Sequence, residues 1–220
     1  AYRHPEYNDC TDDRVQALAV VSGIAEQDKY PYIIDLFKKQ FYASPYMEKY
    51  VLEALCTMGY YQDALNRMKL RYRAMIESPL TTLWEGWGIG SEGFGGGTVN
   101  HAWSGGPLIV IARYVCGIEP LDAAYKTFRI APDDTYLHQA AITIPTIAGE
   151  IRSSFESSDK DFKMEITVPK NTQAILQLPN SVNGEVRVNG KVLSEQGCAL
   201  SAGTYTILAK KIDKFKNLKP

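Results

Sequence analysis

The chain lacks any apolar run of about 18 residues, the length at which a helix can span a membrane, so no segment is expected to insert into a bilayer. The mostly apolar segment at residues 107–118 is too short for that. An excess of charge is also missing, because 24 Lys and Arg stand against 25 Asp and Glu, for a formal net charge of −1. Without a basic surface, neither nucleic acid nor anionic lipid is an expected partner.

Cysteine and histidine are too few and too scattered to compose a metal site. The four cysteines are Cys10, Cys56, Cys116 and Cys198. They show no C-x-x-C spacing and are expected to be free thiols rather than zinc ligands or a disulfide framework. The three histidines are His4, His101 and His138, with no pair four residues apart. No metal and no cofactor is therefore expected.

The first six residues lack the basic and then apolar build of a signal peptide, and such a segment could also have been removed, so the compartment stays open. With 220 residues, of which 45% are hydrophobic, the chain can bury a substantial core. Its length allows one large domain or two small ones.

Residues 12–118 show the three-and-four spacing of amphipathic helices. The clearest case predicts a helix from Pro45 to Met58, with Ser44 as its N-cap and Gly59 just beyond its end. The same spacing over residues 61–75 predicts an antiparallel partner. Apolar positions at 15–25 and 33–41 predict a second helical hairpin. A fifth helix is expected over 108–116, kinked or delayed by Gly105-Gly106-Pro107 and ended by Gly117.

Beyond about residue 121 the pattern changes to alternation, which is typical of half-buried strands. Strands are expected over 126–130, 140–144, 162–168, 174–178, 185–188 and 204–208. Asn189-Gly190 predicts a tight hairpin turn. The sequence therefore predicts two domains, a helical one over residues 1–120 and an antiparallel β-sandwich over residues 121–220. The lysine-rich tail at 210–216 is expected to be solvated and frayed.

The residues that can carry chemistry are concentrated in one window, which holds all three tryptophans. Thr81-Thr82-Leu83-Trp84-Glu85-Gly86-Trp87 is followed by a glycine-rich loop (Gly88, Gly90, Gly93, Gly95, Gly96 and Gly97) and then by Asn100-His101-Ala102-Trp103. The apolar C–H faces of sugar rings pack on indoles, while sugar hydroxyls need carboxylate, imidazole or amide partners. The three tryptophans with Glu85, His101 and Asn100 therefore suit a carbohydrate pocket.

Tryptophan in a helical protein is also a common core residue, so each of the three has a structural alternative. Glu85 is harder to explain structurally, since a buried unpaired carboxylate would be costly. Inverting glycoside hydrolysis needs two carboxylates roughly 6.5–9.5 Å apart, and Glu85 could be either one. Most other acidic residues of the helical half, a set that includes Asp13, Glu48 and Glu53, are expected on solvated helix faces or at caps. No G-x-S-x-G elbow supports a serine hydrolase.

These motifs resemble the inverting bacterial α-L-rhamnosidases. The resemblance is carried by residues 81–87, by Val99-Asn100-His101-Ala102-Trp103, by the stretch from Ser44-Pro45-Tyr46 to Gly59-Tyr60-Tyr61, and by Tyr125-Lys126-Thr127-Phe128-Arg129-Ile130-Ala131-Pro132. It runs in the family's order over about residues 10–210. It implies an (α/α)6 barrel followed by a C-terminal β-sandwich. It also implies Glu85 as the general base, His101 as a ligand to rhamnose hydroxyls, and Trp84 and Trp87 as pocket walls.

Six helical hairpins make such a barrel, and only five helices are predicted here, so the resemblance implies the C-terminal end of a longer enzyme. The family's general acid lies in the region before this match, and no residue here corresponds to it. The chain alone is therefore expected to be inactive or nearly so. Helix faces that further hairpins would cover are expected to be open, which favours self-association. Gly105-Gly106-Pro107 departs from the family pattern and leaves Trp103 without an assigned place.

Two other classes remain as alternatives. A carbohydrate-binding or interaction module would use the sandwich as its working surface, although few aromatic residues there are expected to be exposed. Another helical-toroid glycosidase or a sugar lyase would share the architecture; a lyase needs Tyr with His or Arg around an acidic sugar. Binding of neutral sugars compared with uronates would separate these classes.

Overall fold

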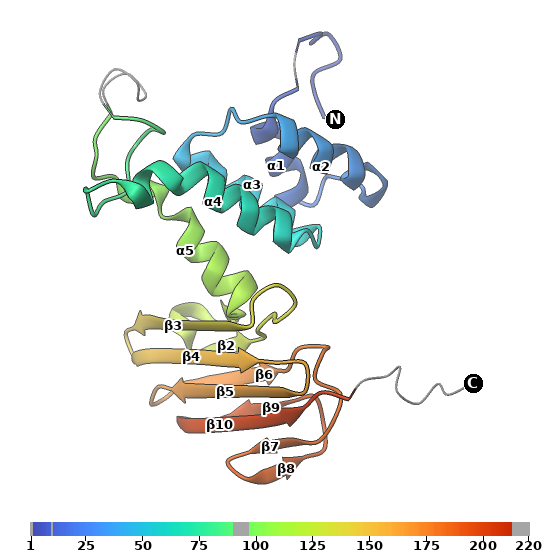
Figure 1. The fold of residues 1–220 in the computed structure, drawn as a ribbon, viewed down its shortest axis with the longest axis vertical. Coiled ribbons are helices and arrows are strands. Elements are labelled where there is room, and N and C mark those ends of the chain that lie inside the picture. The colour runs from blue at the N-terminus through green and yellow to red at the C-terminus, as the bar shows by residue number, and fades with distance from the viewer. Residues whose placement is uncertain (1, 10, 90–96, 213–220) are drawn as a thin grey trace. The chain divides into compact units, whose positions relative to one another are not determined.

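A computed structural model describes residues 2–9, 11–89 and 97–212, which form parts of two compact units, residues 1–110 and 111–220 (Figure 1). Most of the predicted glycine-rich loop, Cys10 and the tail beyond Ile212 lie outside the described residues. The second compact unit begins at Ile111 and contains the strand Ile118–Pro120, while the predicted domains, residues 1–120 and 121–220, stay a prediction.

The first unit is helical, and all five predicted helices are present. Helix α1 is Asp13–Val21, α2 is Tyr30–Lys39, α3 is Pro45–Thr57, α4 is Tyr61–Glu77 and α5 is Gly106–Val110. The predicted ends of α3 are confirmed, since the Ser44 side chain accepts a hydrogen bond from the Met47 N–H, and Gly59 has a φ of +86°. No helix of the described residues combines the length and the apolarity needed to cross a membrane.

The fifth helix differs from the prediction. It begins at Gly106, so Pro107 lies in its first turn. Proline is tolerated there because the backbone N–H that it lacks would have no hydrogen-bond partner within the helix. Its α-helical part ends at Val110, and Ile111–Val115 continues as a π-helical turn, η5, which opens the second unit. The predicted stop at Gly117 is confirmed by a φ of +69°.

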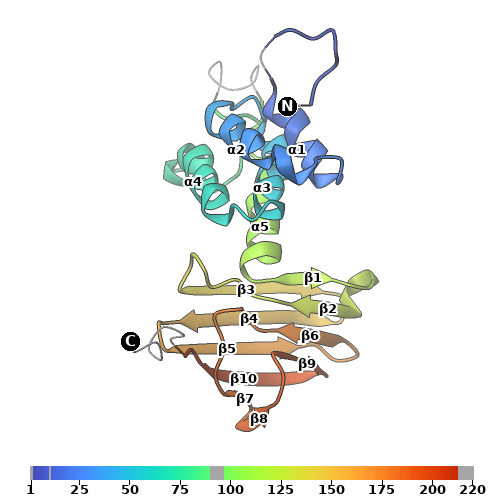
Figure 2. The same ribbon diagram turned by 90° about the vertical axis from the view of Figure 1, so that its right-hand side faces the viewer.

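Helix α3 is the centre of the helical unit. It packs against α1, α4 and α5, and Figure 2 shows it between α1 and α4. Helices α1 and α2, predicted as a hairpin, touch each other little, because α1 packs chiefly on α3. The fully buried side chains of this core include Ile33, Phe37, Leu52 and Leu55.

A buried ionic cluster joins the four long helices. The guanidinium of Arg67 in α4 donates to Asp13 Oδ2 of α1 at 2.7 Å and to Glu48 Oε1 of α3 at 2.6 Å. It also donates to the backbone carbonyls of Phe37 and Gln40 at the end of α2. The expectation that Asp13 and Glu48 are solvated is wrong, since both are fully buried, and Glu53 is buried as well. Arg67 of α4 compensates the buried charges of Asp13 and Glu48, and Lys49 lies 3.7 Å from the Glu53 carboxylate within α3.

The second unit is a two-layer β structure (Figures 1 and 2). A four-stranded sheet contains β1 (Ile118–Pro120), β2 (Thr127–Ile130), β6 (Gln173–Gln177) and β9 (Gly197–Leu200). A six-stranded sheet contains β3 (Gln139–Thr146), β4 (Gly149–Ser157), β5 (Asp161–Val168), β10 (Gly203–Lys210), β7 (Val186–Val188) and β8 (Lys191–Leu193), in that order. All six predicted strands are present.

One strand pair departs from the predicted antiparallel arrangement. Strands β2 and β6 pair in parallel, with Thr127 opposite Gln173 and Ile130 opposite Leu176. Between them the chain runs through β3, β4 and β5 in the other sheet, and so returns to β2 in the same direction. Every pair of the six-stranded sheet is antiparallel.

The two sheets enclose one apolar core. The inner positions of β5, Phe162, Met164 and Ile166, face Phe128 of β2 and Leu176 of β6 in a single buried cluster. Buried and more exposed residues alternate along β5, which explains why the alternating pattern of the sequence predicted this strand. The predicted hairpin is confirmed between β7 and β8, where Asn189 and Gly190 have φ values of +47° and +80°.

A polar cluster fixes the end of the last strand. Asp134, buried in the segment after β2, accepts hydrogen bonds from Ser157 Oγ at 2.6 Å, from Ser181 Oγ at 2.8 Å and from Lys211 Nζ at 2.6 Å. The expectation that the lysine-rich tail is solvated from residue 210 is therefore wrong for Lys211, which pairs with a buried carboxylate.

This cluster predicts an acid-sensitive contribution to stability. Burial raises the pKa of Asp134, but the hydrogen bonds from Lys211, Ser157 and Ser181 outweigh it, so the pKa lies below its ordinary value. A depressed folded-state pKa stabilises the fold above the unfolded pKa of about 3.9, and this contribution is lost as the pH falls through the folded value. Asp134→Asn is expected to lower the free energy of unfolding by about 2 kcal/mol at pH 7, with a difference from wild type that shrinks below about pH 4.

Urea unfolding followed by circular dichroism at pH 7 and at pH 3 measures this difference. Asp161→Asn is the control, because the pair of Asp161 with Lys210 is exposed and contributes within about 1 kcal/mol. A constant difference between wild type and Asp134→Asn across this pH range would contradict the assignment.

Candidate functional site

The predicted site is built on two extended segments of the helical unit, residues 82–85 and 98–101. They lie side by side in opposite directions: the Glu85 N–H donates to the Thr98 carbonyl at 2.9 Å, and the His101 N–H donates to the Leu83 carbonyl at 2.8 Å. The Thr82 hydroxyl donates to the Val99 carbonyl. This pairing brings together two parts of the chain that the sequence places on either side of the glycine-rich loop.

Glu85 is held through one of its two carboxylate oxygens. Oε2 accepts from the Thr98 N–H at 2.9 Å and lies 3.3 Å from the Thr98 hydroxyl and 3.6 Å from His101 Nδ1. A Cβ at position 97 would lie 3.2 Å from Oε2, so Gly97 lets the backbone pass this close. Within the described part of the chain every hydrogen bond to this carboxylate reaches Oε2, which leaves Oε1 for an incoming group. The side chain is 30% exposed, so solvent can reach it.

His101 lies against an exposed aromatic surface. Its ring centroid is 4.4 Å from that of Trp103, and Trp103 is 5.4 Å from Tyr46 of α3. The indole Nε1 of Trp103 donates to the Glu85 carbonyl at 3.2 Å, which fixes the ring beside the glutamate. Trp103 and Tyr46 are 41% and 42% exposed. The structure thus places Trp103 beside Glu85 and His101, where the resemblance had assigned it no place.

The other two tryptophans have different surroundings. Trp84 is only 4% exposed, and its carbonyl accepts from the Ser104 hydroxyl. Trp87 donates from Nε1 to the Ala43 carbonyl at 2.8 Å and packs between Tyr72 and the guanidinium of Arg71. Both therefore make packing contacts of the helical unit. Their predicted role as pocket walls stays a prediction, and Asn100 is exposed at the end of the second extended segment.

The residue that sequence reasoning missed is Thr98. Its backbone and its hydroxyl both reach the Glu85 carboxylate, and the hydroxyl lies 3.1 Å from His101 Nδ1. A threonine three residues before a histidine carries no signal of its own. Only the pairing of the two extended segments places it between the acid and the imidazole.

The cysteines of the described residues do not form a second candidate catalytic or metal site. Cys116 and Cys198 are free thiols, as predicted, and Cys56 is buried. Burial raises the pKa of Cys116 to about 11 and also raises that of Cys198. These two thiols are therefore protonated at neutral pH and are poor nucleophiles. The described residues include no group of three or more His, Cys, Asp or Glu that could hold a metal ion.

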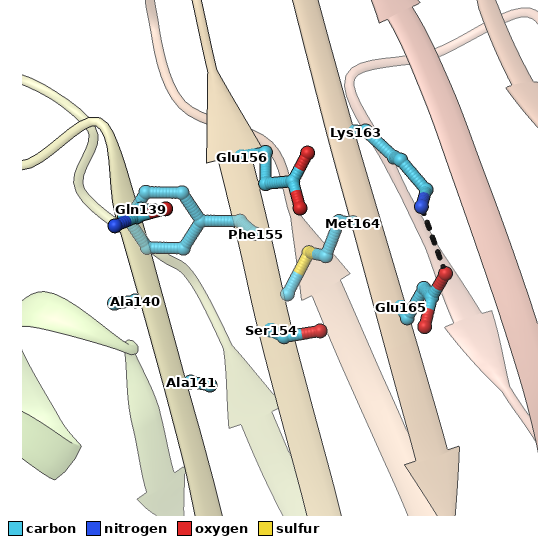
Figure 3. A pocket seen from close by; sticks show the side chains of 9 residues that line it. All are labelled: Gln139, Ala140, Ala141, Ser154, Phe155, Glu156, Lys163, Met164 and Glu165. Atoms are coloured by element: carbon cyan, nitrogen blue, oxygen red, sulfur yellow. Dashed lines mark ion pairs between the residues drawn. The ribbon is translucent and has the colours of Figure 1, made fainter.

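A separate hollow of about 410 Å³ lies on the outer face of the six-stranded sheet (Figure 3). Its lining residues come from β3, β4 and β5, and include Ser154, Glu156 and the ion pair of Lys163 with Glu165. The aromatic residue among them, Phe155, is buried in the core and offers no open ring face. None of the residues predicted for the carbohydrate site lines this hollow.

Both a family model and a curated relative that match this chain are α-L-rhamnosidases. A family model described as the bacterial alpha-L-rhamnosidase C-terminal domain matches residues 117–193. An alpha-L-rhamnosidase of Formosa agariphila is 33% identical over 122 residues, covering 53% of this chain and 13% of the relative.

Two solved structures share the fold. The alpha-L-rhamnosidase from Dictyoglumus thermophilum matches 91% of this chain at a TM-score of 0.77 and 19% identity. The Streptomyces avermitilis alpha-L-rhamnosidase complexed with L-rhamnose matches 89% at a TM-score of 0.72 and 19% identity. This chain covers 26% and 21% of those two chains, and so spans about a quarter or less of its relatives. The chain is similar to the C-terminal region of α-L-rhamnosidases, and its residues 117–193 match the C-terminal domain of that family.

Proposed function

We propose that the protein containing this chain releases terminal α-L-rhamnose from rhamnosides by inverting hydrolysis, and that this chain supplies the general-base side of the site. The observation that carries the proposal is the arrangement around Glu85. Its carboxylate is fixed through Oε2, has Oε1 open, and lies beside His101 and the exposed ring of Trp103. That a relative was crystallised with L-rhamnose supports the choice of sugar.

In this proposal Glu85 Oε1 accepts a proton from a water molecule as the water oxygen bonds to the anomeric carbon. The bond from that carbon to the leaving oxygen breaks, and a general acid protonates the leaving oxygen. Because the water bonds on the opposite face of the sugar ring, the configuration of the anomeric carbon is inverted. His101 hydrogen-bonds to sugar hydroxyls. Trp103 and Tyr46 offer the apolar surface on which the C–H face of a 6-deoxy sugar packs.

The general acid is proposed to lie outside this chain. Asp13 and Glu48, the fully buried carboxylates of the helical unit, are both bound by Arg67 and cannot be free to donate a proton. We therefore expect this chain alone to be inactive or nearly so.

The remaining helices of a barrel are proposed to cover apolar positions that are open here. Val15, Leu18 and Val21 lie on one exposed stripe of α1, and Leu108 and Ile109 of α5 are exposed as well. Apolar surface of this kind favours association, so the isolated chain is expected to self-associate.

Hydrolysis of p-nitrophenyl α-L-rhamnoside by this chain, and by a longer protein that contains it, tests the proposal. In the longer protein, Glu85→Gln is expected to lower kcat about 100- to 10,000-fold, because the base is lost while the shape is kept. The matched control is Glu77→Gln, whose carboxylate pairs with Arg73 on the exposed surface of α4 and should leave kcat unchanged.

The anomeric form of the first product, followed by NMR, tests the stereochemistry, and inversion predicts β-L-rhamnose. Robust hydrolysis by this chain alone would place the second carboxylate within it. Unchanged kcat in Glu85→Gln would remove Glu85 from the reaction.

A further inference from the structure

We propose that Thr98 is a positioning residue that selects the tautomer of His101 and makes its Nε2 a hydrogen-bond acceptor. The meaning of this choice for sugar recognition rests on the proposed function, but the tautomer itself can be measured without substrate. The geometry behind it is a bridge: the Thr98 hydroxyl oxygen lies 3.3 Å from Glu85 Oε2 and 3.1 Å from His101 Nδ1.

The hydroxyl has a single proton and two candidate acceptors. An ionised carboxylate can only accept hydrogen bonds, whereas a neutral imidazole can either donate or accept at Nδ1, depending on its tautomer. The carboxylate therefore determines the direction of the bridge. Thr98 Oγ1 donates to Glu85 Oε2, alongside the Thr98 N–H, which donates to the same oxygen at 2.9 Å.

The hydroxyl oxygen is then left to accept, and among the described residues His101 Nδ1, at 3.1 Å, is the donor within reach. Nδ1 thus carries the ring proton, and its distance of 3.6 Å from Glu85 Oε2 adds a favourable contact with the same negative charge. Nε2 consequently holds a lone pair. Packing of the imidazole against Trp103 keeps the ring in this orientation.

The chemical consequence concerns which substrate group His101 recognises. A ring nitrogen with a lone pair accepts a hydrogen bond from a sugar hydroxyl, and that hydroxyl's oxygen remains free to accept from another donor. One threonine hydroxyl would thus hold the Glu85 carboxylate, which activates water, and would make His101 Nε2 a hydrogen-bond acceptor for the sugar.

The test is the tautomer of His101 in the ¹⁵N-labelled chain at pH 8, where histidine is ordinarily neutral. Two-bond ¹H–¹⁵N correlation spectra distinguish a protonated ring nitrogen from an unprotonated one by a large shift. With three histidines in the chain, assignment needs only His4→Gln and His138→Gln. The exposed His138 serves as the internal reference for histidine in water, and His4, whose Nδ1 accepts from the Glu6 N–H at 3.3 Å, serves as the reference for the Nε2-protonated form.

We expect wild type to show His101 protonated at Nδ1. Thr98→Val keeps the shape and the backbone N–H but removes the bridge, so its His101 should shift toward the tautomer mixture shown by His138. Thr98→Ser should restore the wild-type spectrum. Protonation at Nε2 in wild type would overturn the direction of the bridge, and an unchanged spectrum in Thr98→Val would show that Glu85 alone sets the tautomer. Neither result depends on whether the protein hydrolyses rhamnosides.

Discussion

Replacing Arg67 by methionine is expected to lower the free energy of unfolding of the helical unit by about 3–5 kcal/mol. The guanidinium is the partner of two fully buried carboxylates, Asp13 and Glu48, and donates to the carbonyls that end α2. Methionine fills much of the same volume but leaves Asp13 and Glu48 buried without the counter-charge of Arg67. Arg71, whose Nε lies 3.5 Å from Glu48 Oε2, compensates only in part.

Urea unfolding followed by tryptophan fluorescence measures this loss, because all three tryptophans belong to the helical unit. Arg73→Met is the matched control: it is an arginine of the same helix, paired with Glu77 at the exposed surface, and should cost no more than about 0.5 kcal/mol. Combining Arg67→Met with Asp13→Asn and Glu48→Gln should recover part of the loss. Equal free energies of unfolding for Arg67→Met and Arg73→Met would contradict a stabilising role of Arg67 as the partner of the buried carboxylates.

Gly117→Ala is expected to destabilise the β unit by about 2–5 kcal/mol. Gly117 has a φ of +69°, which costs an alanine conformational strain, and its missing side chain makes room for the neighbouring backbone. A Cβ there would lie 1.9 Å from the carbonyl oxygen of Ala131, whose N–H donates to the Gly117 carbonyl. The chain around β1 and β2 would have to separate, and the hydrogen bond beside the core would be lost.

Gly190→Ala separates the two causes. Gly190 has a similar φ of +80°, but a Cβ there meets open space, so only the backbone strain of about 1–2 kcal/mol applies. Both variants lie in the same unit, and their midpoints can be compared by far-ultraviolet circular dichroism during urea unfolding. If Gly117→Ala lowers the free energy of unfolding no more than Gly190→Ala does, the backbone of residues 131–133 moves away from the added Cβ at little energetic cost.

Helices and strands were predictable where the pattern has a local cause. The helix from Pro45 was visible through Ser44 and Gly59, and the β7–β8 turn through Asn189-Gly190, because caps and turns depend on residues that are neighbours in sequence. The parallel pairing of β2 with β6 and the buried state of Asp13 and Glu48 were not predicted. Both depend on partners that lie distant in the chain.

The candidate site divides in the same way. Glu85 and His101 were identified as residue types with the right chemistry, and the order of the motifs pointed to the α-L-rhamnosidases. Which aromatic residue stands open beside them was decided by tertiary packing, since Trp84 and Trp87 make contacts of the helical unit while Trp103 is exposed.

The sequence by itself determined the two periodicities, the caps, the tight turn and the presence of one acid and one imidazole among three tryptophans. The periodicities, the caps and the turn follow from residues within a few positions of one another, and the acid, the imidazole and the tryptophans all fall between residues 84 and 103. Only the tertiary structure decided that Arg67 neutralises two buried acids, that Lys211 pairs with Asp134, and that Thr98 bridges Glu85 and His101. Such contacts arise when folding brings distant segments together, and the burial of charge and the direction of a hydrogen bond depend on that arrangement.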